Sequence, residues 1–154
     1  MYLLKKIFPF VIMIIFNMTA FSQSKLETPV YVDDQGIAIR GYDPVSYFTD
    51  RRPVKGDPEF SFSWKGARWL FSSSLHKNMF AADPQKYTPQ YGGYCAYGAS
   101  EKHKATTEPD AWTIVNDKLY LNYNLKVKEI WIKDTTARIK LADEYWNSLP
   151  ASKE

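Results

Sequence analysis

Alternation of apolar and polar residues is clearest near the middle of the chain. Phe60, Phe62 and Trp64 alternate with polar residues, and Trp69 and Phe71 continue the same period after a turn that contains a glycine. A period of two residues on both sides of such a turn predicts a β-hairpin. Because these positions are all aromatic, one face of the hairpin needs a second layer that covers it.

The segment that follows this hairpin is suited to supply that layer. Leu75, Met79 and Phe80 recur at helical spacing between residues 72 and 82. A serine within residues 72–74 can accept a hydrogen bond from one of the first backbone N–H groups of such a helix. We therefore expect a helix packed on the aromatic face of the hairpin.

Two further hairpins are predicted, one on each side of this central unit. The first joins the apolar runs 30–32 and 37–39 through an Asp- and Gly-containing turn. The second joins the runs 112–115 and 119–123 through the polar residues 116–118. Both have residues that favour strands on either side of a turn signal.

Helix starts are marked by short capping motifs. Asp43–Pro44 and Asp83–Pro84 combine a residue that caps helices with one that is favoured at the first helical position. Asn124 is placed to cap a long final helix that extends to about Asn147. Hairpins, short packed helices and a long C-terminal helix predict a single small domain of the α+β class.

The first 22 residues have the pattern of a secretory signal peptide. Lys5 and Lys6 precede the apolar run 7–16, and small residues follow up to Ser22. This run is much shorter than the ~20 residues that span a bilayer, so we expect no stable membrane span after cleavage near Ser22. An uncleaved anchor is the alternative. The domain would then occupy residues 23–154 of a periplasmic or secreted protein.

Charge and cysteine content exclude several classes of function. Without the two lysines of the signal segment the formal net charge falls from +3 to +1, and no concentrated basic face is present, so nucleic acid is not an expected partner. A single cysteine excludes an internal disulfide, zinc sites with several cysteines and haem attachment through C-x-x-C-H. Motifs of serine hydrolases, zinc proteases, phosphate-binding loops and dinucleotide-binding folds are also missing.

The strongest chemical signal is the segment from Tyr91 to Tyr97, which contains the only cysteine. Cys95 follows the pair Gly92–Gly93. If a helix starts just after the glycines, Cys95 lies in its first turn, where the helix dipole lowers the thiol pKa and favours the thiolate. A thiolate can bind a metal ion or act as a nucleophile. The alternative role is that of a small buried apolar residue.

A second set of possible metal ligands lies on the predicted helix at 72–82. His76 precedes Met79 by three residues, so both face the same side, and together with the Cys95 thiolate they would suit copper(I). Alternatively, Met79 fills the core and His76 lies at its edge. His103 is flanked by lysines and is expected at the surface.

Aromatic residues near the glycine pair can line a ligand pocket or fill the core. The residues predicted for such a pocket are Tyr91, Gly92, Gly93, Tyr94, Tyr97, Trp64 and Trp69.

Several short motifs occur in a characteristic order along the chain. They are Asp43-Pro44-Val45, Trp64-Lys65-Gly66, Trp69-Leu70-Phe71-Ser72-Ser73, Phe80-Ala81-Ala82-Asp83-Pro84 and Lys86-Tyr87. Residues 41–97, which contain them, resemble the YHS domain family. The motif Tyr91-Gly92-Gly93-Tyr94-Cys95-Ala96 is similar to that of longer, exported members, and residues 111–113 and 119–123 extend this similarity, with the extension reaching about residue 147.

The resemblance implies a binding module for a transition metal, with copper as the first choice, or for a small ligand, centred on Cys95. The short, metal-associated form of the family reads D-P-V-C and F-C-S-x-x-C, and its cysteine positions are here Ser46, Ser72 and His76. Serine hydroxyls are poor ligands for soft metals. Two alternatives stay open: a thiol-dependent enzyme or redox protein that uses Cys95, and a structural or interaction module without a small ligand.

Overall fold

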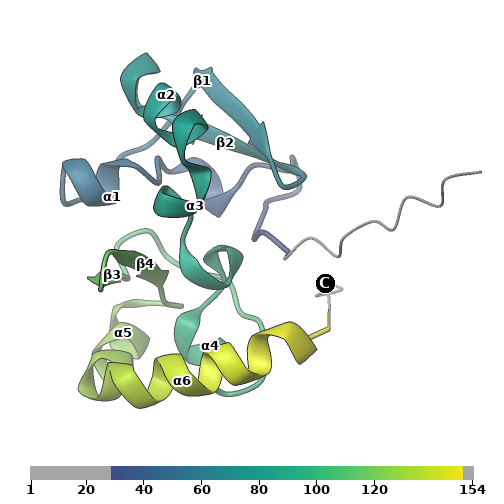
Figure 1. Cartoon of the computed structure of the whole chain (residues 1–154), viewed down its shortest axis with the longest axis vertical. Helices are drawn as coiled ribbons and strands as arrows, with labels where there is room; N and C mark the ends of the chain where they lie inside the picture. Colours follow the sequence, from purple (N-terminus) through teal and green to yellow (C-terminus); the bar gives the residue numbers. More distant parts are fainter. Residues whose placement is uncertain (1–28, 151–154) are drawn as a thin grey trace, which may run out of the picture.

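A computed structural model describes residues 29–150, so the predicted signal segment lies outside the described residues (Figure 1). Its fold class is α+β, as predicted. In chain order the elements are η1 Ile39–Gly41, α1 Ser46–Thr49, β1 Asp57–Trp64, β2 Ala67–Phe71, α2 Ser74–Ala82, α3 Pro84–Tyr87, η2 Gln90–Gly93, α4 Ala96–Ser100, β3 Trp112–Val115, β4 Lys118–Leu121, α5 Leu125–Trp131, η3 Ile132–Asp134, α6 Thr135–Tyr145 and η4 Trp146–Ser148, where η denotes a 3-10 helix.

The aromatic hairpin predicted from the sequence is formed by β1 and β2, which pair antiparallel. Lys65 and Gly66 make the tight turn, with φ angles of 49° and 72°, the positive values that two-residue hairpin turns require. Helix α2 covers the hairpin as expected. The Phe80 ring lies 5.1 Å from the Phe71 ring and 5.2 Å from the Trp69 ring, measured between centroids.

The second hairpin, β3–β4, contributes to two hydrophobic cores. The buried residues of the first core are Ala38, Ile39, Val45, Tyr47, Ala67, Trp69, Phe71, Phe80, Tyr87, Leu119 and Leu121. Those of the second core are Tyr91, Ala96, Ala99, Tyr120, Trp131, Ala142 and Trp146. Leu119 and Leu121 of β4 belong to the first core and Tyr120 to the second, because successive side chains of a strand point to opposite faces. One strand thus packs against both cores.

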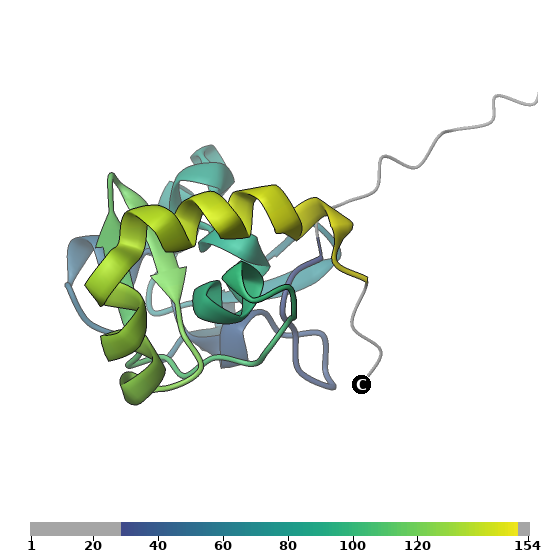
Figure 2. The same ribbon diagram turned by 90° about the horizontal axis from the view of Figure 1, so that it is seen from below.

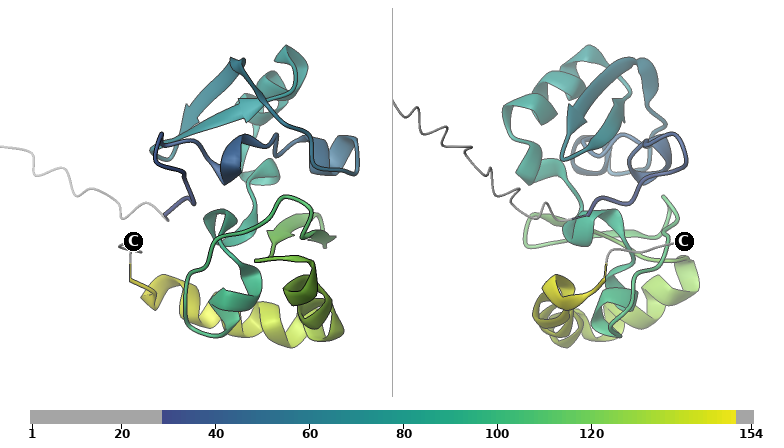
Figure 3. Two further views of the ribbon diagram at one scale, coloured as in Figure 1. Left: turned by 180° about the vertical axis from the view of Figure 1, so that it is seen from behind. Right: turned by 90° about the vertical axis from the view of Figure 1, so that its right-hand side faces the viewer.

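Figures 1 and 3 show the elements up to α3 above those from α4 onward, with the segment from α3 to η2 joining the two groups. Helix α6 runs along the lower side of the molecule, as Figure 2 shows, and it packs against α4. The second core lies between this helix pair and the β3–β4 hairpin. The two groups of elements therefore meet along η2 and the hairpin.

The hairpin predicted from the runs 30–32 and 37–39 is present only as a turn with isolated bridges. Val32 forms a single antiparallel bridge with Ala38, and Ile37 pairs in parallel with Arg68 beside β2. Positive φ at Ile39, 41°, turns the chain into η1 before a second strand can extend. This segment therefore extends the edge of the β1–β2 hairpin and forms no sheet of its own.

The predicted C-terminal helical segment is present from Leu125 to Ser148 and bends at Asp134. Asp134 has φ −149° and ψ 61°, and its side chain accepts a hydrogen bond from the N–H of Ala137 at 3.2 Å. Because an aspartate in this conformation caps a new helix, α6 starts in a new direction. Among residues 29–150, no helix is both long and apolar enough to cross a bilayer.

Candidate functional site

The glycine pair lies where the backbone of residues 29–31 closely approaches that of η2. Tyr91, Gly92 and Gly93 have φ angles of 55°, 62° and 89°, and the carbonyl of Gly92 accepts a 2.9 Å hydrogen bond from the N–H of Tyr31. A Cβ atom on Gly92 would lie only 2.0 Å from the carbonyl oxygen of Pro29. Both reasons for a glycine, positive φ and close backbone approach, therefore apply at this position.

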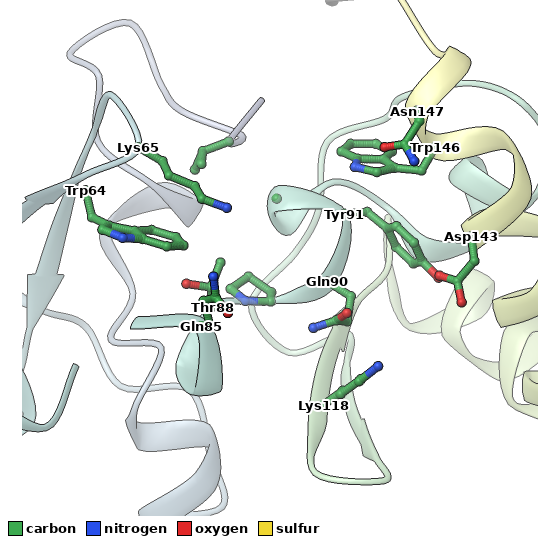
Figure 4. Close-up of a pocket in the computed structure, with 13 residues that line it drawn as sticks. Trp64, Lys65, Gln85, Thr88, Gln90, Tyr91, Lys118, Asp143, Trp146 and Asn147 are labelled. Atoms are coloured by element: carbon green, nitrogen blue, oxygen red, sulfur yellow. The ribbon is translucent and has the colours of Figure 1, made fainter. Parts of the chain in front are cut away.

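A cleft of about 570 Å³ lies beside η2, between the two groups of elements. Its lining residues are Val30, Trp64, Lys65, Gln85, Thr88, Pro89, Gln90, Tyr91, Gly92, Lys118, Asp143, Trp146 and Asn147. Figure 4 shows Trp64 and Lys65 on one side and Tyr91, Asp143 and Trp146 on the other. The cleft is therefore built from both groups of elements.

Packing behind the cleft holds the aromatic side chains of its walls in place. The Trp64 ring makes edge contacts with the rings of Trp69 and Phe80, at centroid distances of 6.2 and 5.9 Å. On the other side the Tyr91 ring lies 5.6 Å from that of Trp146. Rings held in this way offer apolar surface to a ligand at little cost in conformational entropy.

Tyr91 also forms a hydrogen bond with another residue of the cleft wall. Its hydroxyl donates a 2.9 Å hydrogen bond to Oδ1 of Asp143. Burial raises the pKa of the Tyr91 hydroxyl, and the hydrogen bond to Asp143 and its charge act in the same direction. The hydroxyl is therefore protonated at neutral pH and remains a donor to this carboxylate.

Of the residues predicted for a ligand pocket, the structure places three on the cleft: Trp64, Tyr91 and Gly92. Trp69 is fully buried in the first core. Tyr94 and Tyr97 pack against the second core. Gly93 lies against the Ile39 side chain, where a Cβ atom would come within 2.5 Å of Cγ2.

Cys95 caps α4 and lies away from the cleft wall. Its side chain is 2% exposed, and Sγ accepts hydrogen bonds from the N–H groups of Gly98 and Tyr123, both at 3.3 Å. The prediction of a lowered pKa in a first helical turn is wrong, because α4 begins at Ala96 and burial raises the thiol pKa. Hydrogen bonds from backbone N–H groups lower the pKa of the Cys95 thiol but do not reverse this shift.

We expect the thiol of Cys95 to react slowly in the native protein. Burial and the raised pKa both reduce the accessible thiolate, so alkylation at pH 8 should be about a hundredfold or more slower than in the urea-unfolded chain. Mass spectrometry of samples quenched at increasing times measures both rates. Equal rates in native and unfolded protein would contradict the capping role and restore Cys95 as a nucleophile.

A cluster of polar side chains surrounds Asp43, which is completely buried; we call it the Asp43 cluster. Its carboxylate accepts hydrogen bonds from the N–H of Val45 and from the N–H and hydroxyl of Ser72, at 2.7–2.9 Å. Nδ1 of His76 lies 2.6 Å from Oδ2, and since a carboxylate only accepts, this nitrogen carries the proton. The Ser46 hydroxyl donates to the backbone carbonyl of Asp43 at 2.7 Å.

This cluster joins the three positions at which the short YHS form carries cysteines, namely Ser46, Ser72 and His76. Their donors do not fit a soft metal ion, because two are hydroxyls and the imidazole Nδ1 is held by Asp43. Within residues 29–150, no three His, Cys, Asp or Glu side chains are grouped to hold a metal ion.

The structure does not bring Cys95, His76 and Met79 together. Both ring nitrogens of His76 are engaged elsewhere, Nδ1 by Asp43 and Nε2 by the Thr49 hydroxyl at 3.3 Å. Met79 packs against the first core. Figure 1 shows α2, which contains His76, in the upper group of elements and α4, which Cys95 caps, in the lower group.

The chain was also compared with models of protein families, with curated proteins and with solved structures. None of these comparisons gives a match. The resemblance to the YHS family therefore rests on the motif residues alone and stays a prediction.

Several residues of the cleft were missed by the sequence analysis. Lys65, Lys118, Asp143 and Trp146 come from two hairpin turns and the C-terminal helix, and no local pattern links them. The only feature of the sequence that could have indicated these residues is that both lysines lie in or beside predicted hairpin turns. His103 is exposed as expected.

Proposed function

We propose that this protein is an exported binding module of the YHS type that holds a small organic molecule in the cleft between its two groups of elements. The observation that carries the proposal is the cleft of about 570 Å³, lined by aromatic rings, side-chain amides and charged groups. Ligand sites typically have this size and this mixture of apolar surface with a few polar groups.

Support for the YHS resemblance comes from the Asp43 cluster. Ser46, Ser72 and His76 were selected as equivalent positions from motifs alone, and all three hydrogen-bond to one buried residue. In this form of the domain a hydrogen-bonded cluster would stand where the short form holds metal. A small organic ligand is therefore preferred to copper.

The two alternatives are less well supported. A thiol-dependent enzyme or redox protein needs an accessible thiolate, whereas Cys95 is buried and its pKa is raised. A purely structural module has no use for an open cleft with charged side chains on its walls. Binding without catalysis is thus the function that the geometry supports best.

Nuclear magnetic resonance of the ¹⁵N-labelled protein tests the proposal directly. We expect small planar organic compounds to shift the indole N–H signals of Trp64 and Trp146, which line the cleft. The signal of Trp131, which is fully buried in the second core, should stay in place.

A pair of variants separates cleft binding from surface binding. Gln85→Phe adds a ring at the cleft wall, whereas Asn78→Phe adds the same ring on an exposed position of α2 that does not line the cleft. We expect binding to be at least tenfold weaker in Gln85→Phe and unchanged in Asn78→Phe. The proposal fails if no compound shifts the two indole signals, or if both variants bind like the wild type.

A further inference from the structure

The charges around the cleft indicate which class of ligand it takes. Among residues 29–150, its lining includes Lys65, Lys118 and a single carboxylate, that of Asp143. One oxygen of this carboxylate already accepts the Tyr91 hydroxyl at 2.9 Å. The described lining residues therefore carry a net positive charge, and the carboxylate of Asp143 is partly satisfied within the protein.

Both lysines are brought to the cleft by tight hairpin turns. Lys65 is the first residue of the β1–β2 turn, with φ 49°, and Lys118 follows directly after Asn116 and Asp117, which turn β3 into β4 with φ 50° and 58°. Figure 4 shows Lys65 extending its ammonium group toward the middle of the cleft and Lys118 approaching from the other hairpin. Two hairpins that are far apart in the sequence thus each place a lysine on the cleft wall.

Lys65 and Lys118 differ in what surrounds them. The Lys65 ammonium lies 4.5 Å from the centroid of the Trp64 ring, a cation–π contact that holds the charge beside apolar surface. Lys118 is exposed and forms no ion pair with any residue in the range 29–150. An anionic group placed between them would gain from both charges.

Neutral donors on the cleft wall strengthen this preference. Gln85, Gln90 and Asn147 also line the cleft, and none of their side-chain amides has a hydrogen-bond partner among the described residues. An amide N–H₂ group is a good donor to a carboxylate or phosphate oxygen. The fold thus leaves these donors available to a ligand.

The size of the cleft excludes a simple inorganic anion as its full occupant. A volume of about 570 Å³ suits an organic molecule, and an apolar body would contact Val30, Pro89, Tyr91 and Trp146. We propose, on the basis of the binding function above, that the ligand is a planar organic anion whose acidic group lies between Lys65 and Lys118.

The test uses three probes with the same ring system and different charge: indole-3-acetate, indole-3-acetamide and tryptamine. Dissociation constants come from titrations of the ¹⁵N-labelled protein, followed by the indole N–H signals of Trp64 and Trp146. We expect the acetate to bind at least tenfold more tightly than the amide, and tryptamine to bind most weakly. Added salt should reduce the advantage of the acetate, because exposed charges are screened.

Matched lysine variants locate the effect. Lys118→Gln and Lys65→Gln should each lower the acetate-to-amide preference severalfold, whereas Lys126→Gln removes an equal charge from α5 outside the cleft and should leave it unchanged. If acetate and amide bind equally well and Gln85→Phe weakens both, the anion inference is wrong while the binding function stands. If none of the three probes binds while other planar compounds shift the two indole signals, the anion inference is wrong and the binding function stands; if no compound shifts them, both proposals fail.

Discussion

Replacing Gly92 by alanine should lower the free energy of unfolding by roughly 2–5 kcal/mol. A non-glycine residue in the left-handed region costs about 1–2 kcal/mol, and the φ of Gly92 is 62°. The new Cβ atom would also lie 2.0 Å from the carbonyl oxygen of Pro29, so the segment that crosses η2 must move. Overpacking of this kind typically costs a further 1–3 kcal/mol. Urea unfolding followed by tryptophan fluorescence measures the loss.

Gly36→Ala is the matched control for this substitution. Gly36 also has a positive φ, 74°, but nothing lies within 4 Å of the Cβ position. The control should therefore show the cost of the backbone angle alone, about 1–2 kcal/mol. Equal losses in the two variants would mean that the crossing of the N-terminal segment over η2 does not constrain Gly92.

Local features of the fold were predictable because their causes lie within a few residues. Ser73, Asp83 and Asn124 each accept a hydrogen bond from the N–H three residues later, as expected for helix caps. The predicted cap at Asp43–Pro44 is wrong, because α1 begins at Ser46 without a side-chain cap and the Asp43 carboxylate bonds Ser72 and His76 instead. The β1–β2 and β3–β4 hairpins follow from alternation around turn residues. The break at Asp134 was missed, although aspartate within a helical pattern is itself a possible cap.

The candidate site was less predictable because it depends on contacts between distant parts of the chain. The sequence identified Tyr91 and Trp64 as pocket residues, yet Trp69 in the same hairpin is fully buried in the core. Nothing in the local pattern says on which side of the β1–β2 hairpin a cleft will open. The environment of Cys95 depends likewise on Tyr123, which is brought beside it by the β3–β4 hairpin.

The Asp43 cluster and the cleft have different relations to a binding function. In the cluster, the Asp43 carboxylate is hydrogen-bonded to the Ser72 hydroxyl and to the His76 imidazole, and the Ser46 hydroxyl donates to the backbone carbonyl of Asp43. The cleft leaves amide donors and a lysine without partners among the described residues. Buried polar groups that are fully hydrogen-bonded stabilise a unique fold, whereas unsatisfied donors in a concave surface are available to a ligand. This difference agrees with a structural role for the Asp43 cluster and with the binding function that we propose for the cleft.

Asp43→Ala should lower the free energy of unfolding by about 3–5 kcal/mol. Removing one partner from a buried, charge-assisted network leaves the others without hydrogen bonds. The N–H groups of Val45 and Ser72 and Nδ1 of His76 would all lose their acceptor. Asp33→Ala is the control, since Asp33 also accepts two backbone N–H groups but is exposed. It should cost about 1 kcal/mol or less.

A double-mutant cycle tests whether the loss arises from the contact between Asp43 and His76. In the wild type these side chains lie 2.6 Å apart, so His76→Ala should cost clearly less when Asp43 is already alanine. Contacting residues in one hydrogen-bond network couple by 0.5–3 kcal/mol, and we expect about 1 kcal/mol or more here. Additive effects would show that the contact between Asp43 and His76 is not the source of the loss. An Asp43→Ala variant as stable as Asp33→Ala would show that the cluster contributes little to stability. In that case the convergence of Ser46, Ser72 and His76 on Asp43 would call for a functional explanation.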